Sequence, residues 1–317
     1  MIKDVILGID TSNYTTSVAV VGVDGELIAN LKRPLPVKAG ERGLRQSDAL
    51  FSHTVNLPEI MSDLKKHTEG CRIVSVGVSD RPRNVSGSYM PCFLAGVASA
   101  VSISSCLGIP IYRFSHQCGH IMAALTSSGR TDLLDCSFVA FHVSGGTTEM
   151  LWVTPDKNGF STDIIGGTKD LNAGQVIDRI GVHLGLPFPA GRYVEELALQ
   201  NVKKIPKRKL STEACYVNLS GLENMAVRLY DDTGDKALVC AFVLDYIGRA
   251  LVEISDNYRI ERGDHPYVYA GGVMSNSIIK KMLSEGRDAA FAEPALSADN
   301  AVGVAMLALR AYKSENF

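Results

Sequence analysis

Two histidines, His116 and His120, stand four residues apart in the run Phe114-Ser-His-Gln-Cys-Gly-His-Ile-Met122. On a helix this spacing places both imidazoles on one face, as two ligands of one metal ion require. Ser115 fits the N-cap position, so His116 would lie in the first helical turn. There the helix dipole favours neutral imidazole, the form that binds metal. The pair therefore predicts a metal site, although such pairs also occur on ordinary surfaces and core edges.

Two polar turns that follow apolar runs have the character of phosphate-binding turns. The first is Asp10-Thr-Ser-Asn-Tyr-Thr-Thr16, and the second is Val143-Ser-Gly-Gly-Thr-Thr148. Gly145 and Gly146 permit positive φ and would let backbone N–H groups approach an anion closely. Such turns can equally serve only to reverse the chain, but two related turns in equivalent places favour a ligand.

The bulk composition is that of a soluble globular protein. The chain has 317 residues, 46% hydrophobic and 21% charged, with a formal net charge of −2. This length predicts two lobes, each with its own hydrophobic core. The net charge does not indicate a protein that is basic overall, as many nucleic-acid-binding proteins are. A local exception is Lys203-Lys-Ile-Pro-Lys-Arg-Lys209, which is either a solvated loop or a phosphate-contacting surface.

Cysteine usage and the N-terminus predict a cytoplasmic protein. Seven cysteines without a Cys-x-x-Cys pair suggest neither a disulfide framework nor a thiolate zinc cage. The apolar run that begins at Val5 is broken by Asp10, too early for a signal peptide. Since no apolar stretch approaches the roughly 20 residues of a membrane span, no membrane association is expected.

The elements that must position these residues occur in two similar sets. Each set opens with three predicted strands and continues with helices. The strands are 5–12, 16–22 and 25–30, then 137–144, 148–153 and 160–165; a later strand, 267–270, precedes Gly271-Gly-Val-Met-Ser-Asn276. This duplication predicts an α/β fold of the actin, sugar-kinase and Hsp70 class, with nucleotide in a cleft between two lobes. We expect lobes 1–130 and 131–317, with the last helix, about 298–314, packing back toward the N-terminal lobe.

The order of these motifs, together with Ala298-Asp-Asn300, resembles the TsaD family, formerly called O-sialoglycoprotein endopeptidase or glycoprotease. The resemblance runs through nearly the whole chain. It implies a transferase that moves a threonylcarbamoyl group from its adenylate to N6 of the tRNA adenosine beside the anticodon. It also implies a cytoplasmic enzyme with related protein partners of the threonylcarbamoyl system.

The resemblance further implies a set of site residues. The metal ligands fall on His116, His120 and Asp299, a donor set suited to one divalent iron or zinc ion. The residues implied for ATP or an adenylate are Asp10, Ser12, His142, Val143, Ser144, Gly145, Gly146, Asp178, Gly191, Gly271, Gly272 and Asn276. Asp178 and Gly191 could instead be a surface helix residue and a plain helix start. No catalytic acid or base is assigned.

Several positions depart from the family pattern, in which the first turn carries an Asp-Glu pair. Here Asn13, Tyr14 and Thr15 occupy that turn, so the two acids are missing. Arg81 and Arg83 enter where the family has glycines, either to hold an anion or to cap a lengthened loop. These changes suit a divergent paralog.

Three functions therefore remain open. The first is the threonylcarbamoyl transfer itself, and the second is a carbamoyl transferase or ATPase with another acceptor. The third is a non-catalytic nucleotide-binding partner protein. Protease chemistry has little support, because Gln117-Cys118-Gly119 lacks the catalytic Glu of His-Glu-x-x-His. Cys118 is expected to be a small buried filler, and the histidines at 53, 67 and 183 to lie at the surface or core edge.

Overall fold

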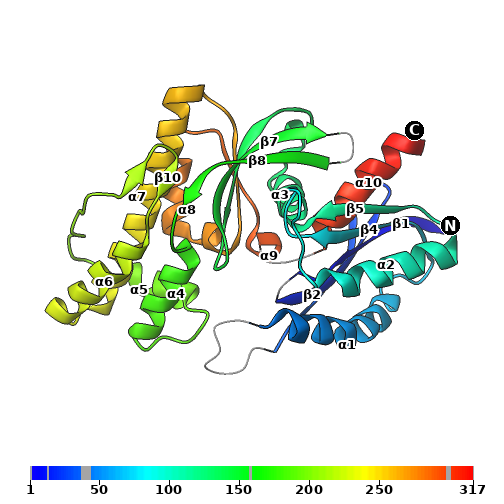
Figure 1. Ribbon diagram of the computed structural model, residues 1–317, viewed down its shortest axis with the longest axis horizontal. Coiled ribbons are helices and arrows are strands. Elements are labelled where there is room, and N and C mark those ends of the chain that lie inside the picture. Colours follow the sequence, from blue (N-terminus) through cyan, green and yellow to red (C-terminus); the bar gives the residue numbers. More distant parts are fainter. Residues whose placement is uncertain (1, 13, 37–43, 157–158, 298–300, 317) are drawn as a thin grey trace. The chain divides into compact units, whose positions relative to one another are not determined.

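The computed structural model describes residues 2–12, 14–36, 44–156, 159–297 and 301–316. The chain divides into two compact units, each built around its own sheet (Figure 1). Unit 1 comprises residues 1–131, 155–161 and 298–317, and unit 2 comprises residues 132–154 and 162–297. Both units combine a mixed sheet with helices, which confirms the predicted α/β class.

The sheet of unit 1 has five strands in the order β3-β2-β1-β4-β5. β1 (Lys3–Asp10), β2 (Thr15–Gly22) and β3 (Leu27–Pro34) form an antiparallel meander. β4 (Cys71–Arg81) pairs parallel with β1, and β5 (Ile111–Ser115) pairs parallel with β4. The three strands predicted to open this half of the chain are therefore present, followed by two crossover connections.

The two faces of this sheet are covered by different helices. Successive side chains of a strand point to opposite faces. Val5, Leu7 and Ile9 of β1 share a core with α1 (Gln46–Lys65) and α2 (Phe93–Leu107). Gly8 lies between Leu7 and Ile9 in the strand and faces the opposite side of the sheet. There it lies against Ala301 and Ala305, at the start of α10 (Val302–Asn316).

Small residues bring α10 unusually close to α3 (His116–Ser128), the helix that carries the histidine pair. A Cβ atom added to Gly303 would lie 1.8 Å from the carbonyl oxygen of Gly119 and 2.9 Å from the backbone nitrogen of Ala123. Gly77 of β4 likewise leaves room for Ala308, whose Cβ would lie 2.7 Å from an added Cβ. Backbone-to-backbone packing thus fixes α3 against α10, and only glycine fits at these contacts.

The sheet of unit 2 has seven strands in the order β12-β11-β6-β7-β8-β10-β9. β6 (Phe138–Val143), β7 (Thr148–Asp156) and β8 (Gly159–Thr168) repeat the three-strand meander, and the β6–β7 pairing is antiparallel. β11 (Tyr267–Ala270) pairs parallel with β6 and continues the sheet toward β12 (Ala289–Phe291). The parallel register places Ala270 beside His142, so the turn after β6 and the segment after β11 lie at one edge.

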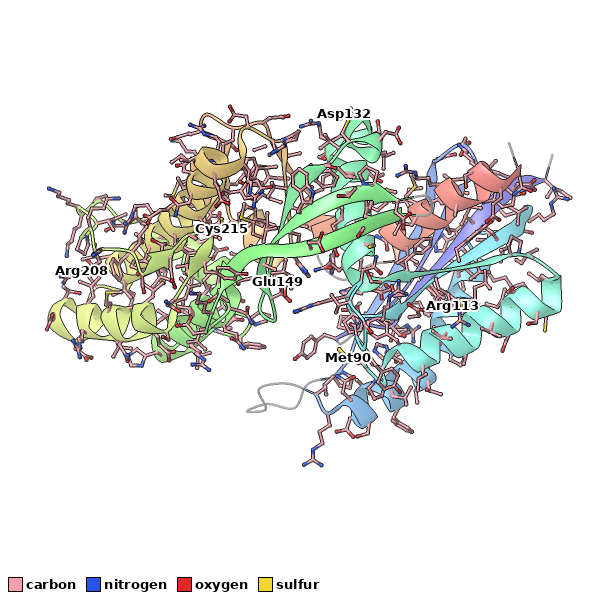
Figure 2. The ribbon with its side chains drawn as sticks, turned by 45° about the horizontal axis from the view of Figure 1, so that its top comes forward. Met90, Arg113, Asp132, Glu149, Arg208 and Cys215 are labelled. Carbon is pink, nitrogen blue, oxygen red and sulfur yellow. The ribbon has the colours of Figure 1, made fainter. Side chains whose placement is uncertain are left out.

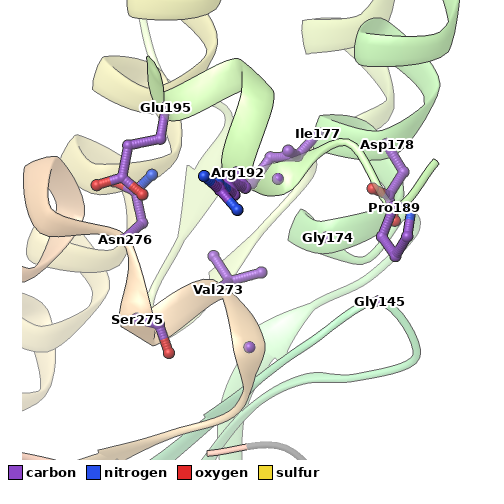
Figure 3. Close-up of a pocket in the computed structure, with 12 residues that line it drawn as sticks. Gly145, Gly174, Ile177, Asp178, Pro189, Arg192, Glu195, Val273, Ser275 and Asn276 are labelled. Carbon is purple, nitrogen blue, oxygen red and sulfur yellow. The ribbon is translucent and has the colours of Figure 1, made fainter. Parts of the chain in front are cut away.

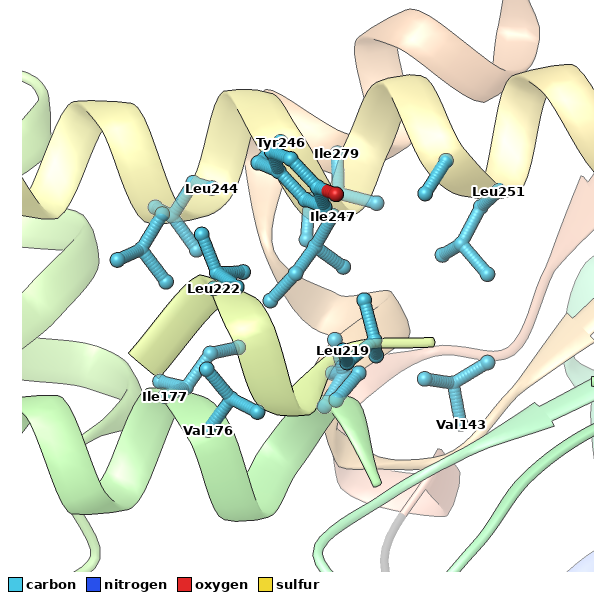
Figure 4. Packing of buried hydrophobic residues seen from close by; sticks show 14 of the residues in the cluster. Val143, Val176, Ile177, Leu219, Leu222, Leu244, Tyr246, Ile247, Leu251 and Ile279 are labelled. Carbon is cyan, nitrogen blue, oxygen red and sulfur yellow. The ribbon is translucent and has the colours of Figure 1, made fainter. Parts of the chain in front are cut away.

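The core of unit 2 centres on α7 (Lys236–Arg262), which begins at its N-cap Asp235. Figure 4 shows Leu244 and Ile247 of α7 pointing toward α6 (Ser220–Thr233) and α4 (Ala173–His183). These side chains belong to one apolar cluster that also includes Val143, at the end of β6. The core therefore reaches the turn that follows β6 and anchors its first residue.

The main elements lie where the sequence predicts them, with shifts of a few residues at their ends. The elements that sequence patterning missed are short: β9 (Thr212–Glu213), β10 (Tyr216–Val217), β12, and the short helices η1 (Thr131–Asp135), η2 (Gly272–Ser275) and α9 (Pro294–Ser297). Two- and three-residue strands carry no detectable alternation. Among the helices of the described ranges, none combines the length and apolar character needed to cross a bilayer.

Candidate functional site

The histidine pair has the geometry expected from its spacing. α3 begins at His116, and the Ser115 hydroxyl accepts a hydrogen bond from the backbone N–H of Cys118 at 3.2 Å, as an N-cap does. The Nε2 atoms of His116 and His120 lie 2.9 Å apart, and His120 is buried. Two nitrogens bound to one ion at about 2.1 Å each lie about 3 Å apart when their bonds meet near a right angle. The two nitrogens therefore converge as ligands of one ion would.

The other ring nitrogen of His116 faces a buried carboxylate. Nδ1 of His116 lies 3.0 Å from Oδ2 of Asp10, and Asp10 is fully buried at the end of β1. The Ser12 hydroxyl donates to the same carboxylate oxygen at 3.0 Å. Oδ1 of Asp10 is buried and has no hydrogen-bond partner among the described residues. Of the two residues expected at a nucleotide turn, Asp10 thus lies against His116 in unit 1, and Ser12 lies against Asp10.

The described residues supply two imidazole nitrogens of the kind that bind a divalent metal. Asp10 approaches His116 on the nitrogen that faces away from His120, so it does not complete a ligand trio. No group of three His, Cys, Asp or Glu side chains able to hold a metal occurs within the described ranges. The third predicted ligand, Asp299, lies outside them, so the three-ligand set stays a prediction.

The substituted loop near this pair is held by its own residues. Arg81 donates from Nη1 to Oδ1 of Asp80 at 2.5 Å and from Nη2 to Oδ1 of Asn84 at 2.6 Å. The Asn84 amide in turn donates to the carbonyl oxygen of Phe160 at 2.8 Å. Of the two roles considered for Arg81, these contacts favour the one that shapes the loop.

Cys118 and His53 are both buried in unit 1. Cys118 is 2% exposed, and its thiol lies 3.4 Å from the carbonyl oxygen of Phe160, as expected for a buried filler. Burial raises the pKa of this thiol, which keeps it protonated. His53 was expected at the surface or core edge, and that expectation is wrong: it is fully buried, with Nδ1 2.8 Å from Oγ1 of Thr16.

Unit 2 contains a pocket of about 430 Å³ beside the glycine turns. In Figure 3, Glu195 and Asn276 lie on one side of the pocket, Asp178 and Pro189 on the other, and Arg192 between them. Five of the predicted nucleotide residues line this pocket: Gly145, Asp178, Gly191, Gly272 and Asn276. Its remaining lining residues are Gly174, Ile177, Pro189, Arg192, Glu195, Val273 and Ser275.

Asp178 is the half-buried carboxylate of this pocket. Its Oδ1 accepts a hydrogen bond at 2.7 Å from the backbone N–H of Ala190, immediately before α5 (Gly191–Ala198). Burial raises the pKa of the Asp178 carboxyl, and the Ala190 hydrogen bond opposes that shift. With Oδ1 engaged, Oδ2 is the oxygen that could accept from a ligand hydroxyl.

The turn after β6 is shaped by close backbone contacts. A Cβ on Gly174 would lie 2.6 Å from both the backbone nitrogen of Gly145 and the carbonyl oxygen of Ser144. Gly271 has φ +99°, and its Cβ would lie 2.3 Å from the carbonyl oxygen of Val143. Both glycines thus permit the first turn of α4 and the segment after β11 to touch the turn after β6.

Gly145 and Gly146 were predicted to be needed for a positive φ, and that reason is wrong, because neither residue has a positive φ. A Cβ at either position would have no heavy atom within 4 Å in the described residues beyond its two neighbours in the chain. These glycines therefore leave open space at the turn rather than adopting a left-handed backbone. Ser144 closes the turn, since its N–H donates to the carbonyl of Thr147 at 2.7 Å and its hydroxyl accepts from Gly146. His142 and Val143 belong to β6 and do not line the pocket.

The opposite wall of the pocket is held by α8 (Ser277–Ser284) and α5. Asn276 caps α8, because its Oδ1 accepts from the backbone N–H groups of Ile278 and Ile279, both at 3.1 Å. Glu195 accepts from the Ser277 N–H at 2.7 Å. Arg192 and Glu195 were not predicted. Their signal was available, since they lie one and four residues after Gly191 on the same helix.

The basic run lies on a loop beside α7, and Figure 2 shows Arg208 projecting at its outer edge. Lys203 pairs with Asp235, and Lys207 pairs with Asp245, both at 2.7 Å. Asp245 also receives Arg249 at 2.7 Å. Lys204, Arg208 and Lys209 are exposed, and the described residues offer their side chains no carboxylate within 4.0 Å. Ion pairs of Lys203 and Lys207 therefore hold the loop in place, while its other three basic side chains remain exposed.

Comparison with known proteins gives a consistent picture. The family model of tRNA N6-adenosine threonylcarbamoyltransferase (TsaD) matches residues 51–306. The enzyme of that name from Streptococcus suis is 28% identical, with 100% of this chain and 95% of that protein covered. The one from Methanopyrus kandleri is 27% identical, with 95% and 86% covered.

Solved structures match at the level of the fold. Component A of (R)-2-hydroxyglutaryl-CoA dehydratase from Acidaminococcus fermentans superposes with a TM-score of 0.55 at 14% identity. The alignment covers 98% of this chain and 99% of that one. This likeness confirms the actin-like and Hsp70-like fold class that the duplicated meanders predicted.

Proposed function

The chain belongs to the TsaD family of tRNA N6-adenosine threonylcarbamoyltransferases, and on that premise we propose its reaction and its site. It transfers a threonylcarbamoyl group from the adenylate to N6 of the tRNA adenosine beside the anticodon. It acts in the cytoplasm with partner proteins of the threonylcarbamoyl system. The observation that carries the proposal is the pocket of unit 2, which gathers Gly145, Asp178 and Asn276.

We assign this pocket to the adenosine part of the adenylate. Pockets for small ligands combine apolar walls with a few placed polar groups, as Ile177 and Val273 do here beside Asp178. Oδ2 of Asp178 accepts a ribose hydroxyl, because Oδ1 already accepts from Ala190. The open space beside Gly145 and Gly146 leaves room for the phosphate at this turn.

The histidine pair of unit 1 is assigned to a divalent iron or zinc ion. His116 and His120 would hold it through Nε2, with Asp299 as the expected third ligand. Such an ion would supply Lewis-acid polarisation of a carbonyl group when it is bound. The short distance between the two Nε2 atoms supports this assignment.

The transfer itself is a substitution at the carbamoyl carbon. The N6 amine of the adenosine forms a bond to that carbon, and the bond from the carbon to the phosphate oxygen breaks. AMP leaves with the electron pair, and N6 gives up one proton. The residues of this chain bind and orient the adenylate, whose phosphate departs at the turn after β6.

Reconstitution with threonylcarbamoyl-adenylate, tRNA and the partner proteins tests the proposal. Nucleoside mass spectrometry should detect threonylcarbamoyl-adenosine with the wild-type chain and much less with Asp178→Asn. Asp232→Asn, on the exposed surface of α6, serves as the matched control and should retain activity. Absence of the modified nucleoside with the wild-type chain would overturn the proposed acceptor.

A second candidate function keeps the donor and changes the acceptor. It is favoured by the first turn, where Tyr14 and Thr15 replace two acids, and Tyr14 is 40% exposed. Asn13, the third changed residue, lies outside the described residues. Complementation of a strain that lacks its own threonylcarbamoyltransferase separates the two functions, because a changed acceptor predicts no rescue.

A further inference from the structure

We propose that Asp10 is a positioning residue that fixes the tautomer and ring orientation of His116, so that Nε2 of His116 faces the metal. This inference rests on the proposed metal site and adds a residue outside its ligand set. It starts from the contact between Oδ2 of Asp10 and Nδ1 of His116 at 3.0 Å.

The chemistry of that contact assigns the proton. An ionised carboxylate only accepts hydrogen bonds, so Nδ1 of His116 must donate. A neutral imidazole with its proton on Nδ1 has its lone pair on Nε2. That nitrogen lies 2.9 Å from Nε2 of His120. Asp10 thereby directs the lone pair of His116 toward the point where both histidines converge.

The carboxylate is itself held in place by several contacts. Asp10 is fully buried and pairs with Ser17 of β2, and Ser12 donates to its Oδ2 at 3.0 Å. Thr11 fixes the end of β1 against α2, because its hydroxyl donates to the carbonyl of Cys92 at 3.0 Å and accepts from the Gly96 N–H at 3.1 Å. The carboxylate therefore cannot follow His116 if that ring turns.

The imidazole is confined from the other side as well. The ring of Phe93 lies 6.3 Å from the ring of His116 between centroids, and the two histidine rings meet edge to face at 4.3 Å. Carboxylates that accept from the distant nitrogen of a metal-bound histidine typically contribute 10- to 100-fold to metal affinity. Asp10 occupies that place here.

The first test reads the tautomer without metal. In ¹⁵N-histidine-labelled protein, NMR should show His116 protonated on Nδ1 in the wild type, with the signal identified by its loss in His116→Gln. Asp10→Ala should shift the population toward the Nε2-protonated form. Finding wild-type His116 protonated on Nε2 alone would overturn the proposal, and circular dichroism shows whether each variant is folded.

The second test measures Co²⁺ affinity by visible absorption. We expect about 10- to 100-fold weaker binding in Asp10→Ala. Asp10→Asn, of similar volume and with an oxygen that still accepts, should lose less than Asp10→Ala does. Asp4→Asn, on the same strand, should bind like wild type. Equal affinity of wild type and Asp10→Ala would refute the inference. If the wild-type chain itself binds no Co²⁺, the proposed metal site is wrong, and the tautomer experiment alone decides the role of Asp10.

Discussion

Replacing Gly303 with alanine should separate α10 from α3 and destabilise unit 1. The added Cβ would lie 1.8 Å from the carbonyl oxygen of Gly119, whereas ordinary van der Waals contact begins near 3.4 Å. One helix must therefore move by about 1.6 Å, although α10 also contacts β1 and β4 through Gly8 and Gly77.

The size of the effect follows from two opposing contributions. Overpacking a close-packed interior costs about 1–3 kcal/mol and occasionally more. Replacing glycine by alanine in a helix contributes up to about 1 kcal/mol in the opposite direction. Because the clash involves backbone rather than a flexible side chain, the upper end of the overpacking range applies, and the opposing gain leaves a net loss of about 2 kcal/mol in the free energy of unfolding.

Gly221→Ala provides the matched control. Gly221 lies in α6, has no positive φ, and its Cβ would meet no neighbouring heavy atom within 4 Å. We expect this variant to gain about 0.4–1 kcal/mol. Urea unfolding followed by circular dichroism measures both variants, while fluorescence of Trp152, the single tryptophan, reports on unit 2. A Gly303→Ala protein as stable as wild type would refute the packing argument.

Three further predictions concern the pocket, the start of α6 and the basic loop. Asp178→Asn should weaken AMP binding by about 10- to 100-fold, the range for a lost hydrogen bond to a charged group, as calorimetry can measure. Asp170 accepts from the backbone N–H groups of Leu219 and Ser220 at the start of α6. Burial raises the pKa of Asp170, but hydrogen bonds from the Ser220 hydroxyl and from these backbone groups outweigh it and lower the pKa to about 2. Because the folded-state pKa is lowered, its contribution is present above about pH 4 and is lost as pH falls toward 2. Asp170→Asn should therefore cost about 1 kcal/mol at pH 7, reduced by solvent exposure, and flatten the acid limb of urea unfolding; an unchanged limb would contradict this. Lys204, Arg208 and Lys209 are the three exposed basic residues of the run, and we expect their replacement by glutamate to weaken the salt dependence of tRNA binding. If each of them contacts a phosphate, the magnitude of the slope of log affinity against log salt concentration should fall by about 2–3. An unchanged slope would show that the loop is solvated and does not contact tRNA.

Much of the fold could be predicted because its signals are local. The N-cap at Ser115, the spacing of the histidines and the glycine-rich segment after β11 each depend on neighbours in the sequence. The duplicated meander emerged in the same way, from turn residues between apolar runs. The strands β9 and β10 escaped because so short a ladder depends on its partner strand and not on its own pattern.

The site was predicted less completely because its contacts join distant segments. No spacing rule indicates that Asp10 meets His116 across 106 residues, or that Glu195 meets Ser277 across 82. Gly145 shows a different limit. Its residue type was rightly associated with a turn, yet the physical reason is open space and not a left-handed backbone. Composition can indicate that glycine is needed, but only the neighbouring atoms show why.

The segment 155–161 and the last helix both belong to unit 1. In the chain, the segment 155–161 interrupts the residues of unit 2, and the last helix follows them. Unit 1 is thus assembled from three stretches of sequence, and no single truncation yields it whole. A fragment that ends near residue 131 would lack α10, and the glycine contacts that place α3 would face solvent. Genetic dissection of this protein should therefore use paired fragments or circular permutation, since cutting once removes part of the scaffold that holds the histidines.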